Sequence, residues 1–218
     1  MDPAFWHARW EAGQIGFHQP EIHVLLRQFW PQLQLPRAQR VFVPLCGKSL
    51  DMLWLLEQGQ RVLGVEISPL AVAAFFRDNA LQAEVQAAPP FQRWRLDELE
   101  LWCGDYFDLR PEHLSGIGAV YDRASLIALP PEMRRRYADH LAALLAPGTP
   151  VLLITLEYPQ AQMKGPPFSV TEAEVRALFG DAFAITLLEG KAILDQEPHF
   201  RAKGLTDLME KAWRLVRR

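Results

Sequence analysis

With 218 residues, the chain is long enough to bury one full hydrophobic core, and a composition of 50% hydrophobic and 22% charged residues excludes a disordered protein. The formal net charge of −3 lacks the clustered Lys and Arg excess that binding to nucleic-acid phosphates requires. No apolar run approaches the roughly 20 residues of a membrane span, and the first residues lack a signal-peptide pattern. We therefore expect one soluble domain with neither a nucleic-acid nor a membrane partner.

The two cysteines, Cys46 and Cys103, form neither a CxxC motif nor a disulfide framework. Such cysteine usage is typical of a protein in the reducing cytoplasm, which is the location we expect. The histidines near the N-terminus have no carboxylate or cysteine partners at ligand spacing, so the sequence predicts no metal site. Three consecutive arginines, residues 134–136, are expected to form a solvated helix face.

The chain begins with an unusually aromatic stretch, "FWHARWEAGQIGFHQPEIH", at residues 5–23. Helical spacing of apolar residues from Ile22 to Trp30 then predicts an amphipathic helix, with Pro20 suited to its first turn. The segment "RVFVPLCGKSLDMLWLLEQGQRVLGVEISPLAVAAFFRDNAL" reads as strand, glycine turn, helix, strand and helix. Ser68 is expected to cap the second helix, and Pro69 suits its first position.

Continuous apolar runs such as "VFVPL", "VLGVEI", "AVYD" and "PVLLITLE" are typical of parallel strands buried on both faces. Because helical patterns separate these runs, we expect a doubly wound α/β sheet. Between the second and third of these strands, "RWRLDELELWCGDYF" is expected to form a hairpin or an extended approach to a strand ending near Cys103. A helix over "PPEMRRRYADHLAALLAPG" should precede the strand "PVLLITLE".

The last third of the chain changes character. Residues 159–168 contain residues least compatible with helix or strand and should form a loop. "TEAEVRALFG" predicts a short helix, with Thr171 and Glu174 spaced as in a capping box. "FAITLLEGKAIL" and "LMEKAWRLVRR" are expected to pair in antiparallel fashion at one sheet edge, although periodicity alone would equally allow a terminal helix.

The exit from the first strand indicates which ligand the sheet binds. It carries one glycine, Gly47, where a dinucleotide fingerprint needs three, so NAD and FAD are disfavoured. Phe42 occupies the position of the first glycine of a P-loop, which excludes that motif. Glu66 ends the second strand nineteen residues after Gly47, where a carboxylate grips ribose hydroxyls. The sequence therefore predicts a ligand that has a nucleoside but no phosphates for a loop to bind, and S-adenosylmethionine is such a ligand.

Five motifs together resemble the thiopurine S-methyltransferase family. They are "RW..G...FHQ" at residues 9–19, "VPLCGKSLDM", "GVEIS", "CGDYFDL" and "YDRASLIALPPEMRRRYA". The resemblance is strong over residues 5–160 and suggests a bacterial member. It implies a class I methyltransferase fold: a Rossmann-like, doubly wound, mostly parallel seven-stranded sheet with an antiparallel edge strand and an N-terminal lid. It also implies S-adenosylmethionine as donor and a monomer.

The resemblance divides one methyltransferase domain into a lid and helix (residues 1–35), a cofactor-binding core (36–158) and a C-terminal loop, helix and antiparallel edge (159–218). The implied acceptors are thiopurines and other aromatic or heterocyclic thiols. Bacterial members are also linked to selenium and tellurium methylation, and hence to tellurite resistance. Two alternatives stay open: an O- or N-methyltransferase of small molecules on this fold, and a non-catalytic nucleoside-binding module.

The resemblance also assigns roles to single residues. Trp10, in the lid, would cover the sulfonium of the donor and attract it through a cation–π interaction, unless it only packs against a helix. Leu45 would present its backbone to the methionyl ammonium, where the alternative is a core leucine. Asp105, after the third strand, would help read the adenine edge.

Further implied roles concern the acceptor. Arg123 would contact both donor and acceptor, and a buried arginine there needs a partner, either Asp122 or the carboxylate of the donor. Phe17 would line the acceptor pocket, and Arg201 would add positive charge from the C-terminal side. We expect no catalytic base, because an aromatic thiol is acidic enough to react once it is aligned with the donor.

Overall fold

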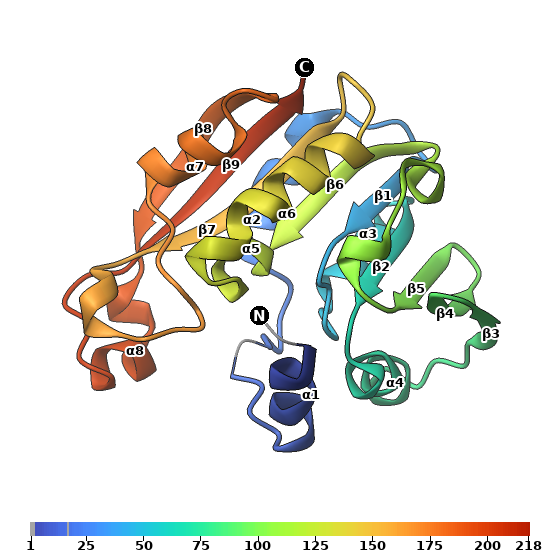
Figure 1. Ribbon diagram of the computed structural model, residues 1–218, viewed down its shortest axis with the longest axis horizontal. Coiled ribbons are helices and arrows are strands. Elements are labelled where there is room, and N and C mark those ends of the chain that lie inside the picture. The colour runs from blue at the N-terminus through green and yellow to red at the C-terminus, as the bar shows by residue number, and fades with distance from the viewer. Residues whose placement is uncertain (1–2, 17) are drawn as a thin grey trace. The chain divides into compact units, whose positions relative to one another are not determined.

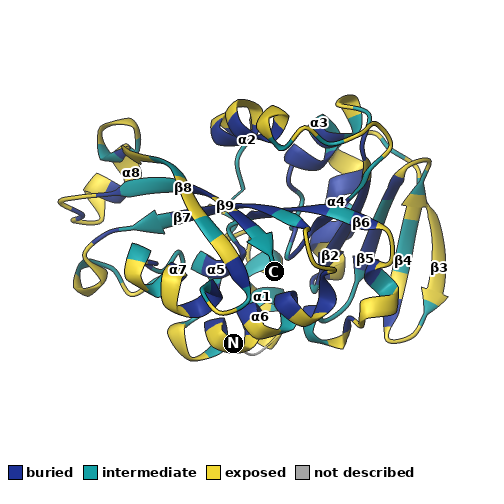
Figure 2. Ribbon diagram, turned by 90° about the horizontal axis from the view of Figure 1, so that it is seen from above, coloured by how far each residue is buried: buried dark blue, intermediate teal, exposed yellow. Residues whose placement is uncertain are grey.

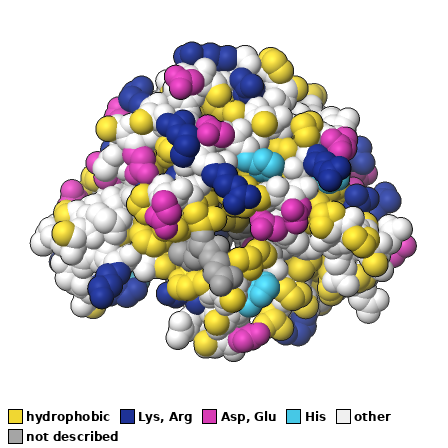
Figure 3. All heavy atoms as spheres, viewed as in Figure 1, with side chains coloured by type: hydrophobic (Ala, Val, Ile, Leu, Met, Phe, Trp, Pro, Cys, Tyr) yellow, Lys and Arg dark blue, Asp and Glu magenta, His cyan; other side chains and the backbone are white. Residues whose placement is uncertain are grey.

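The structure, a computed structural model, describes residues 3–16 and 18–218. The chain divides into two compact units, residues 1–121 and 122–218. Within the described residues, no helix is long and apolar enough to cross a membrane. Charged side chains of both signs are interspersed over the face seen in Figure 3.

The first unit is built on a sheet whose strands follow the order β3-β4-β5-β2-β1-β6. Strand β1 runs parallel to β2 and β6, and β2 runs parallel to β5, whereas β4 is antiparallel to both β3 and β5. The strands are β1 (Arg40–Val43), β2 (Arg61–Glu66), β3 (Glu84–Ala88), β4 (Phe91–Leu96), β5 (Leu99–Cys103) and β6 (Ile117–Arg123), the last of which leads into the second unit.

Helices and 3-10 turns connect these strands. They are α1 (Pro3–Glu11), α2 (Val24–Phe29), η1 (Trp30–Leu33), α3 (Asp51–Glu57), α4 (Pro69–Asp78), η2 (Tyr106–Asp108) and η3 (Pro111–Leu114). The predicted cap of α4 is confirmed, because the Ser68 hydroxyl accepts a hydrogen bond from the Ala71 amide at 3.3 Å. Central strands are buried, whereas β3 is exposed along the edge of the sheet (Figure 2).

The amphipathic helix near the N-terminus is shorter than its sequence pattern. It begins at Val24, not near Pro20, and passes into a 3-10 turn at Trp30. His23 is extended, and its backbone N–H donates to the Asp51 carboxylate at 2.8 Å, so a tertiary contact sets the start of the helix. The predicted apolar face is confirmed, since Leu25, Leu26, Phe29 and Trp30 are buried.

The second unit contains an antiparallel group of three strands, in which β9 pairs with both β7 and β8. The C-terminal segment is therefore a strand and not a helix, because it pairs with β8 and β7. The elements are α5 (Ser125–Ala128), α6 (Pro131–Leu144), β7 (Pro150–Glu157), η4 (Gln160–Gln162), α7 (Glu172–Phe179), β8 (Phe183–Ala192), η5 (Leu194–Gln196), α8 (Pro198–Ala202) and β9 (Met209–Arg217).

The expected α/β class, with a mostly parallel sheet and antiparallel edge, is confirmed (Figure 1). The described residues form nine strands instead of the expected seven. The two additional strands are β3 and β4. Strand β4 forms the expected hairpin with β5 before Cys103, and β3 adds one further antiparallel strand beside β4.

The prediction of a solvated face for residues 134–136 is wrong for Arg134, which is only 1% exposed. Its guanidinium donates to the carbonyl oxygens of Leu129 and Ser169 and to the Glu174 carboxylate at 2.7 Å. Thr171 caps α7 as predicted. The Glu174 side chain, however, pairs with Arg134, because a buried cation needs a carboxylate more than an exposed helix end does.

A buried carboxyl group joins the end of β6 to α6. The Tyr137 hydroxyl donates to Asp122 Oδ2 at 2.6 Å, and both side chains are fully buried. Burial raises the pKa of Asp122 to about 6, although hydrogen bonds from Tyr137 and Ser125 oppose the shift. The folded protein thus holds this proton more tightly than the unfolded chain does, whose Asp pKa is about 3.9.

This difference predicts how stability depends on pH. The contribution of Asp122 to the free energy of unfolding is greatest below pH ~4 and is lost as pH rises through about 6, leaving a cost of roughly 3 kcal/mol. Wild type should therefore lose stability relative to Asp122→Asn between pH 4.5 and 7 in urea unfolding. Asp139→Asn, on an exposed position of α6, is the control. A pH-independent difference for Asp122→Asn would contradict this assignment.

Candidate functional site

The carboxyl ends of β1, β2 and β5 are joined through Glu66, the last residue of β2. The backbone N–H of Gly47 donates to Glu66 Oε2 at 2.9 Å, and the N–H of Ser68 donates to Oε1 at 2.8 Å. The carbonyl oxygen of Glu66 accepts from the N–H of Gly104, after β5, at 2.9 Å. One residue therefore fixes the turns that follow three neighbouring parallel strands.

The Glu66 carboxylate is 6% exposed, and its environment balances two opposing effects. Burial raises the pKa of Glu66, whereas backbone hydrogen bonds from Ser68, Gly47 and Ile67 and the nearby His7 lower it. A carboxylate has about four lone-pair sites, and the three backbone bonds leave room for a further hydrogen bond. The group can therefore brace the turns and still accept a hydrogen bond from a ligand hydroxyl.

The turn after β1 has a strained backbone next to this carboxylate. Leu45 has φ of +46°, in the left-handed region that a branched side chain adopts only when the surrounding structure enforces it. Leu45 is half-buried, so it is not a core leucine. Gly47 also has positive φ, +53°, and a Cβ at this position would lie 3.6 Å from Cζ2 of Trp10. The Trp10 indole therefore covers the glycine that Glu66 holds.

Helix α1 brings Trp10 to this place. None of its side chains is buried, and it lies beside α4 (Figure 1). His7 Nε2 donates to the carbonyl oxygen of Ile67, directly after Glu66, at 3.1 Å. The aromatic N-terminal segment is thus attached to the strand ends by polar contacts and surface packing, not by a buried apolar face.

Asp105 lies next to Gly104, and its carboxylate accepts from the Phe107 N–H at 2.9 Å as the cap of η2. The thiols of this region are poor nucleophiles. Burial, followed by the charge of Glu66, raises the pKa of Cys103 to about 11 and raises the pKa of Cys46 well above its usual value. Both cysteines stay protonated at neutral pH, so neither acts as a covalent nucleophile.

In the first unit the structure brings together Trp10, Leu45, Glu66 and Asp105. Arg123 ends β6 and is followed by Ala124 with φ of +70°. Asp122 Oδ2 accepts from the Tyr137 hydroxyl, and the expected partner of Arg123, either Asp122 or the carboxylate of the donor, stays a prediction.

Of the two residues expected near the acceptor, the structure describes only Arg201. Arg201, on α8, is exposed and forms an ion pair with Asp195. Phe17 lies outside the described residues, so its expected role in an acceptor pocket stays a prediction.

Two features of the site were missed from the sequence. The bracing function of Glu66 depends on amides of three different loops, and the His7 contact joins residues 60 positions apart. No local pattern contains either feature. Among the described residues, no group of three or more His, Cys, Asp or Glu is placed to hold a metal ion.

Solved structures define the class of the fold. An S-adenosylmethionine-dependent methyltransferase from Anabaena variabilis matches with a TM-score of 0.65 and 15% identity, covering 99% of this chain and 95% of that one. Phosphoethanolamine N-methyltransferase 2 of Haemonchus contortus matches with a TM-score of 0.61 and 10% identity, over 88% of this chain and 52% of that one. The fold is that of the class I methyltransferases.

The family follows from the sequence relatives. The family model "Thiopurine S-methyltransferase (TPMT)" matches residues 1–218. Proteins named thiopurine S-methyltransferase from Pseudomonas entomophila and Nitrosospira multiformis are 53% and 50% identical, over 100% of this chain and 100% and 99% of theirs. The chain belongs to the thiopurine S-methyltransferase family, which makes it an enzyme that transfers methyl groups from S-adenosylmethionine.

The bracing geometry generates a prediction for Glu66. Glu66→Gln would turn an amide NH2 toward a backbone N–H, and hydrogen bonds to a charged group contribute about 1.5–3 kcal/mol. We expect a loss of that size in free energy of unfolding without ligand, and a rise of roughly tenfold to a hundredfold in the dissociation constant of S-adenosylhomocysteine.

Glu84→Gln, on the exposed strand β3, is the matched control and should change neither quantity. Unfolding in denaturant and calorimetry measure the two effects separately. Unchanged stability in a folded Glu66→Gln protein would contradict the bracing role, and unchanged ligand affinity would contradict the cofactor role.

Proposed function

We propose that the protein transfers the methyl group of S-adenosylmethionine to the sulfur of thiopurines and other aromatic or heterocyclic thiols. The observation that carries the proposal is the Glu66 carboxylate, held by Gly47 and Ser68 at the strand ends, in a chain of the thiopurine S-methyltransferase family. This is the edge of a parallel sheet at which nucleosides bind.

The cofactor supplies a methyl group on a positively charged sulfur, which needs no further activation. In the proposed site, the remaining lone-pair site of Glu66 accepts from a ribose hydroxyl. Asp105 lies where an adenine edge is read, and the strained backbone at Leu45 faces the methionyl group. Trp10, directly over Gly47, offers its ring face to a cation, an interaction of ~0.5–2 kcal/mol depending on desolvation. These four assignments are our proposal.

The acceptor needs alignment more than it needs a base. An aromatic thiol is partly ionised near neutral pH, so in-line attack depends on bringing sulfur and methyl together and excluding water. Such alignment can supply ~7–11 kcal/mol of the barrier. We propose that Arg123 supports the negative charge of the acceptor. The region's own thiols, at Cys46 and Cys103, stay protonated and do not compete for the methyl group.

We extend the proposal to reduced selenium and tellurium compounds, whose nucleophilic atoms share the group chemistry of sulfur. Tellurite resistance of the host would follow from that activity. The family resemblance is the support for this extension and for a monomeric enzyme that acts on a small molecule. The cysteine usage is the support for a location in the cytoplasm.

The function is tested by methyl transfer from labelled S-adenosylmethionine to a matched panel of acceptors. We expect turnover of 6-mercaptopurine and thiophenol and none of phenol or aniline, whose higher pKa values would require a positioned base. Transfer to phenol or aniline with none to thiols would establish an O- or N-methyltransferase. Donor binding without transfer to any acceptor would establish a non-catalytic module. Selenols, and tellurite supplied together with a thiol reductant, test the extension in the same assay.

We further propose that α1 is the mobile part of a lid over the cofactor. Its support is that none of its side chains is buried, and that its contacts include His7 with the Ile67 carbonyl oxygen and Trp10 with Gly47, beside the proposed cofactor site. A surface helix in this position gains order from a ligand beneath it, whereas the buried strands are already close to the global stability limit.

Hydrogen exchange tests the lid. Amides of residues 3–16 should become more protected when S-adenosylhomocysteine is added, while those of β1 and β7 change little. Deletion of residues 1–18 should abolish methyl transfer and leave the sheet folded. High protection of residues 3–16 with and without ligand, or unfolding of the truncated protein, would show that the segment is part of the core.

A further inference from the structure

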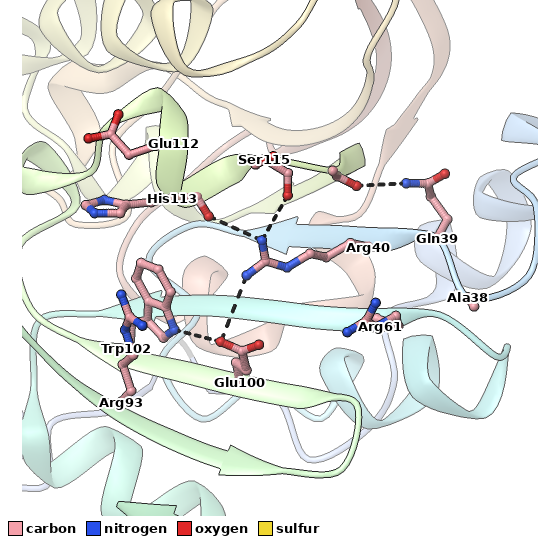
Figure 4. Close-up of a pocket in the computed structure, with 11 residues that line it drawn as sticks. Ala38, Gln39, Arg40, Arg61, Arg93, Glu100, Trp102, Glu112, His113 and Ser115 are labelled. Atoms are coloured by element: carbon pink, nitrogen blue, oxygen red, sulfur yellow. Dashed lines mark hydrogen bonds and ion pairs between the residues drawn. The ribbon is translucent and has the colours of Figure 1, made fainter. Parts of the chain in front are cut away.

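A cavity lies in the first unit at the opposite end of the strands from Glu66. It has a volume of about 530 Å³ and includes three arginines, Arg40, Arg61 and Arg93, among its lining residues (Figure 4). Arg40 and Arg61 are the first residues of β1 and β2 and are paired in register. The cavity therefore begins where these strands start, whereas Glu66 stands where β2 ends.

The strand register places the lining side chains on one face of the sheet. Leu63, two residues after Arg61, pairs with Glu100, and Arg93 pairs with Trp102, two residues after Glu100. Because side chains alternate between faces, Arg61, Glu100, Trp102 and Arg93 all lie on the same side. The chain around η3, with His113, borders the cavity (Figure 4).

The guanidinium of Arg40 already bonds to other groups of the protein. Its Nη1 donates to the carbonyl oxygens of His113 at 3.3 Å and Ser115 at 3.1 Å, and Nη2 lies 3.9 Å from the Glu100 carboxylate. Burial lowers the pKa of Arg40, Glu100 raises it, and Arg61 and Arg93 lower it further. Arg40 is therefore fixed by these contacts and forms a wall of the cavity.

The guanidinium of Arg93 has no such hydrogen bonds within the described residues. Its guanidinium carbon lies 4.2 Å from the centre of the Trp102 ring, a cation–π contact that orients the group. Within residues 3–16 and 18–218, Arg93 has neither a hydrogen-bond partner nor a carboxylate partner, and its Nε is buried. A preorganised, desolvated guanidinium without an anion has the properties of an anion-binding group.

Other groups add donors around Arg93. Arg61 is bonded through Nε to Glu98 at 2.5 Å, which leaves its two Nη groups available. The Arg110 N–H donates to Nδ1 of His113, so the ring carries its proton on Nε2 and can donate from there.

The carboxylates of the region do not pair with Arg93. Glu100 accepts from Trp102 Nε1 at 3.1 Å and faces Arg40, and exposed Glu112 is the other acidic residue of the lining. Arg40 faces Glu100 and Arg61 is paired with Glu98, which leaves Arg93 as the lining arginine without a carboxylate partner among the described residues. Exposed Arg95, opposite Glu100 in the register, adds another cation on this face.

The shape of the site limits the kind of ligand. Trp102 is 3% exposed, because the Arg93 guanidinium lies over its ring and the ring centre of Phe91 lies 5.4 Å from its own. The indole therefore offers no free surface on which a nucleobase could stack. The free donors are guanidinium N–H groups, whose planar fork matches the oxygens of phosphate.

We propose that this cavity is a binding site for phosphate dianions, either free phosphate or the phosphate of a small phosphomonoester. Arg93 is the principal contact, and Arg61 and His113 Nε2 are supporting donors. The site is separate from the methyl-transfer site, because its lining contains none of the residues around Glu66.

Calorimetry on the full-length protein tests the site with inorganic phosphate and glycerol phosphate at pH 8, at constant ionic strength in chloride. We expect saturable binding of phosphate, with acetate at least tenfold weaker because it is a monoanion. Tighter binding of glycerol phosphate would identify a phosphomonoester as the source, and equal or weaker binding would identify free phosphate. Saturation with S-adenosylhomocysteine should leave phosphate affinity unchanged.

Arg93→Gln should raise the phosphate dissociation constant at least tenfold, and Arg61→Gln should raise it several-fold. Arg214→Gln, an exposed arginine on β9, is the matched control and should leave it unchanged. Thermal unfolding verifies that each variant folds, and Arg61→Gln decides the test if Arg93→Gln does not fold. No saturable phosphate binding, equal binding of acetate, or unchanged affinity in the folded cavity variants would overturn the proposal.

Discussion

A buried carboxylate satisfied by backbone amides is the constraint on which the ligand-binding end of this protein depends. Glu66 holds Gly47 and Ser68 through its side chain and Gly104 through its carbonyl oxygen. A charge at 6% exposure is costly unless hydrogen bonds compensate it, so the turns after β1, β2 and β5 are positioned together. The same carboxylate is the proposed ribose acceptor, which means that the group binding the ligand also shapes the site.

The parallel arrangement of β1, β2 and β5 gives the first unit two chemically different ends. At the carboxyl ends, turns with positive φ at Leu45 and Gly47 expose backbone groups next to an acidic side chain, which suits a ribose and a cationic sulfur. At the amino ends of β1 and β2, arginines gather around a cavity in which Arg93 has no carboxylate partner among the described residues. Two ligands of opposite character can therefore use one sheet without competing.

The proposed methyl transfer asks little of the protein beyond positioning. A methyl group on a sulfonium is already activated, so the protein must align the reactants and exclude water. In our proposal the ends of the strands provide the alignment, and α1, which contacts this end through His7 and Trp10, opens to admit ligands and closes over them. Protonated, partly or fully buried thiols at Cys46 and Cys103 leave the acceptor as the reactive sulfur.

The sequence by itself determined the features that depend on neighbouring residues. These include the apolar parallel strands, the cap of α4 at Ser68, the Thr171 cap of α7 and the family motifs at the strand ends. Tertiary structure alone decided the start of α2, which depends on Asp51, and the burial of Arg134, which takes Glu174 away from the helix end. It also decided that the last segment is a strand, because β7 and β8 supply its partners. The reason is physical: caps and periodicity are local, whereas the partners of a buried charge or an edge strand come from distant parts of the chain.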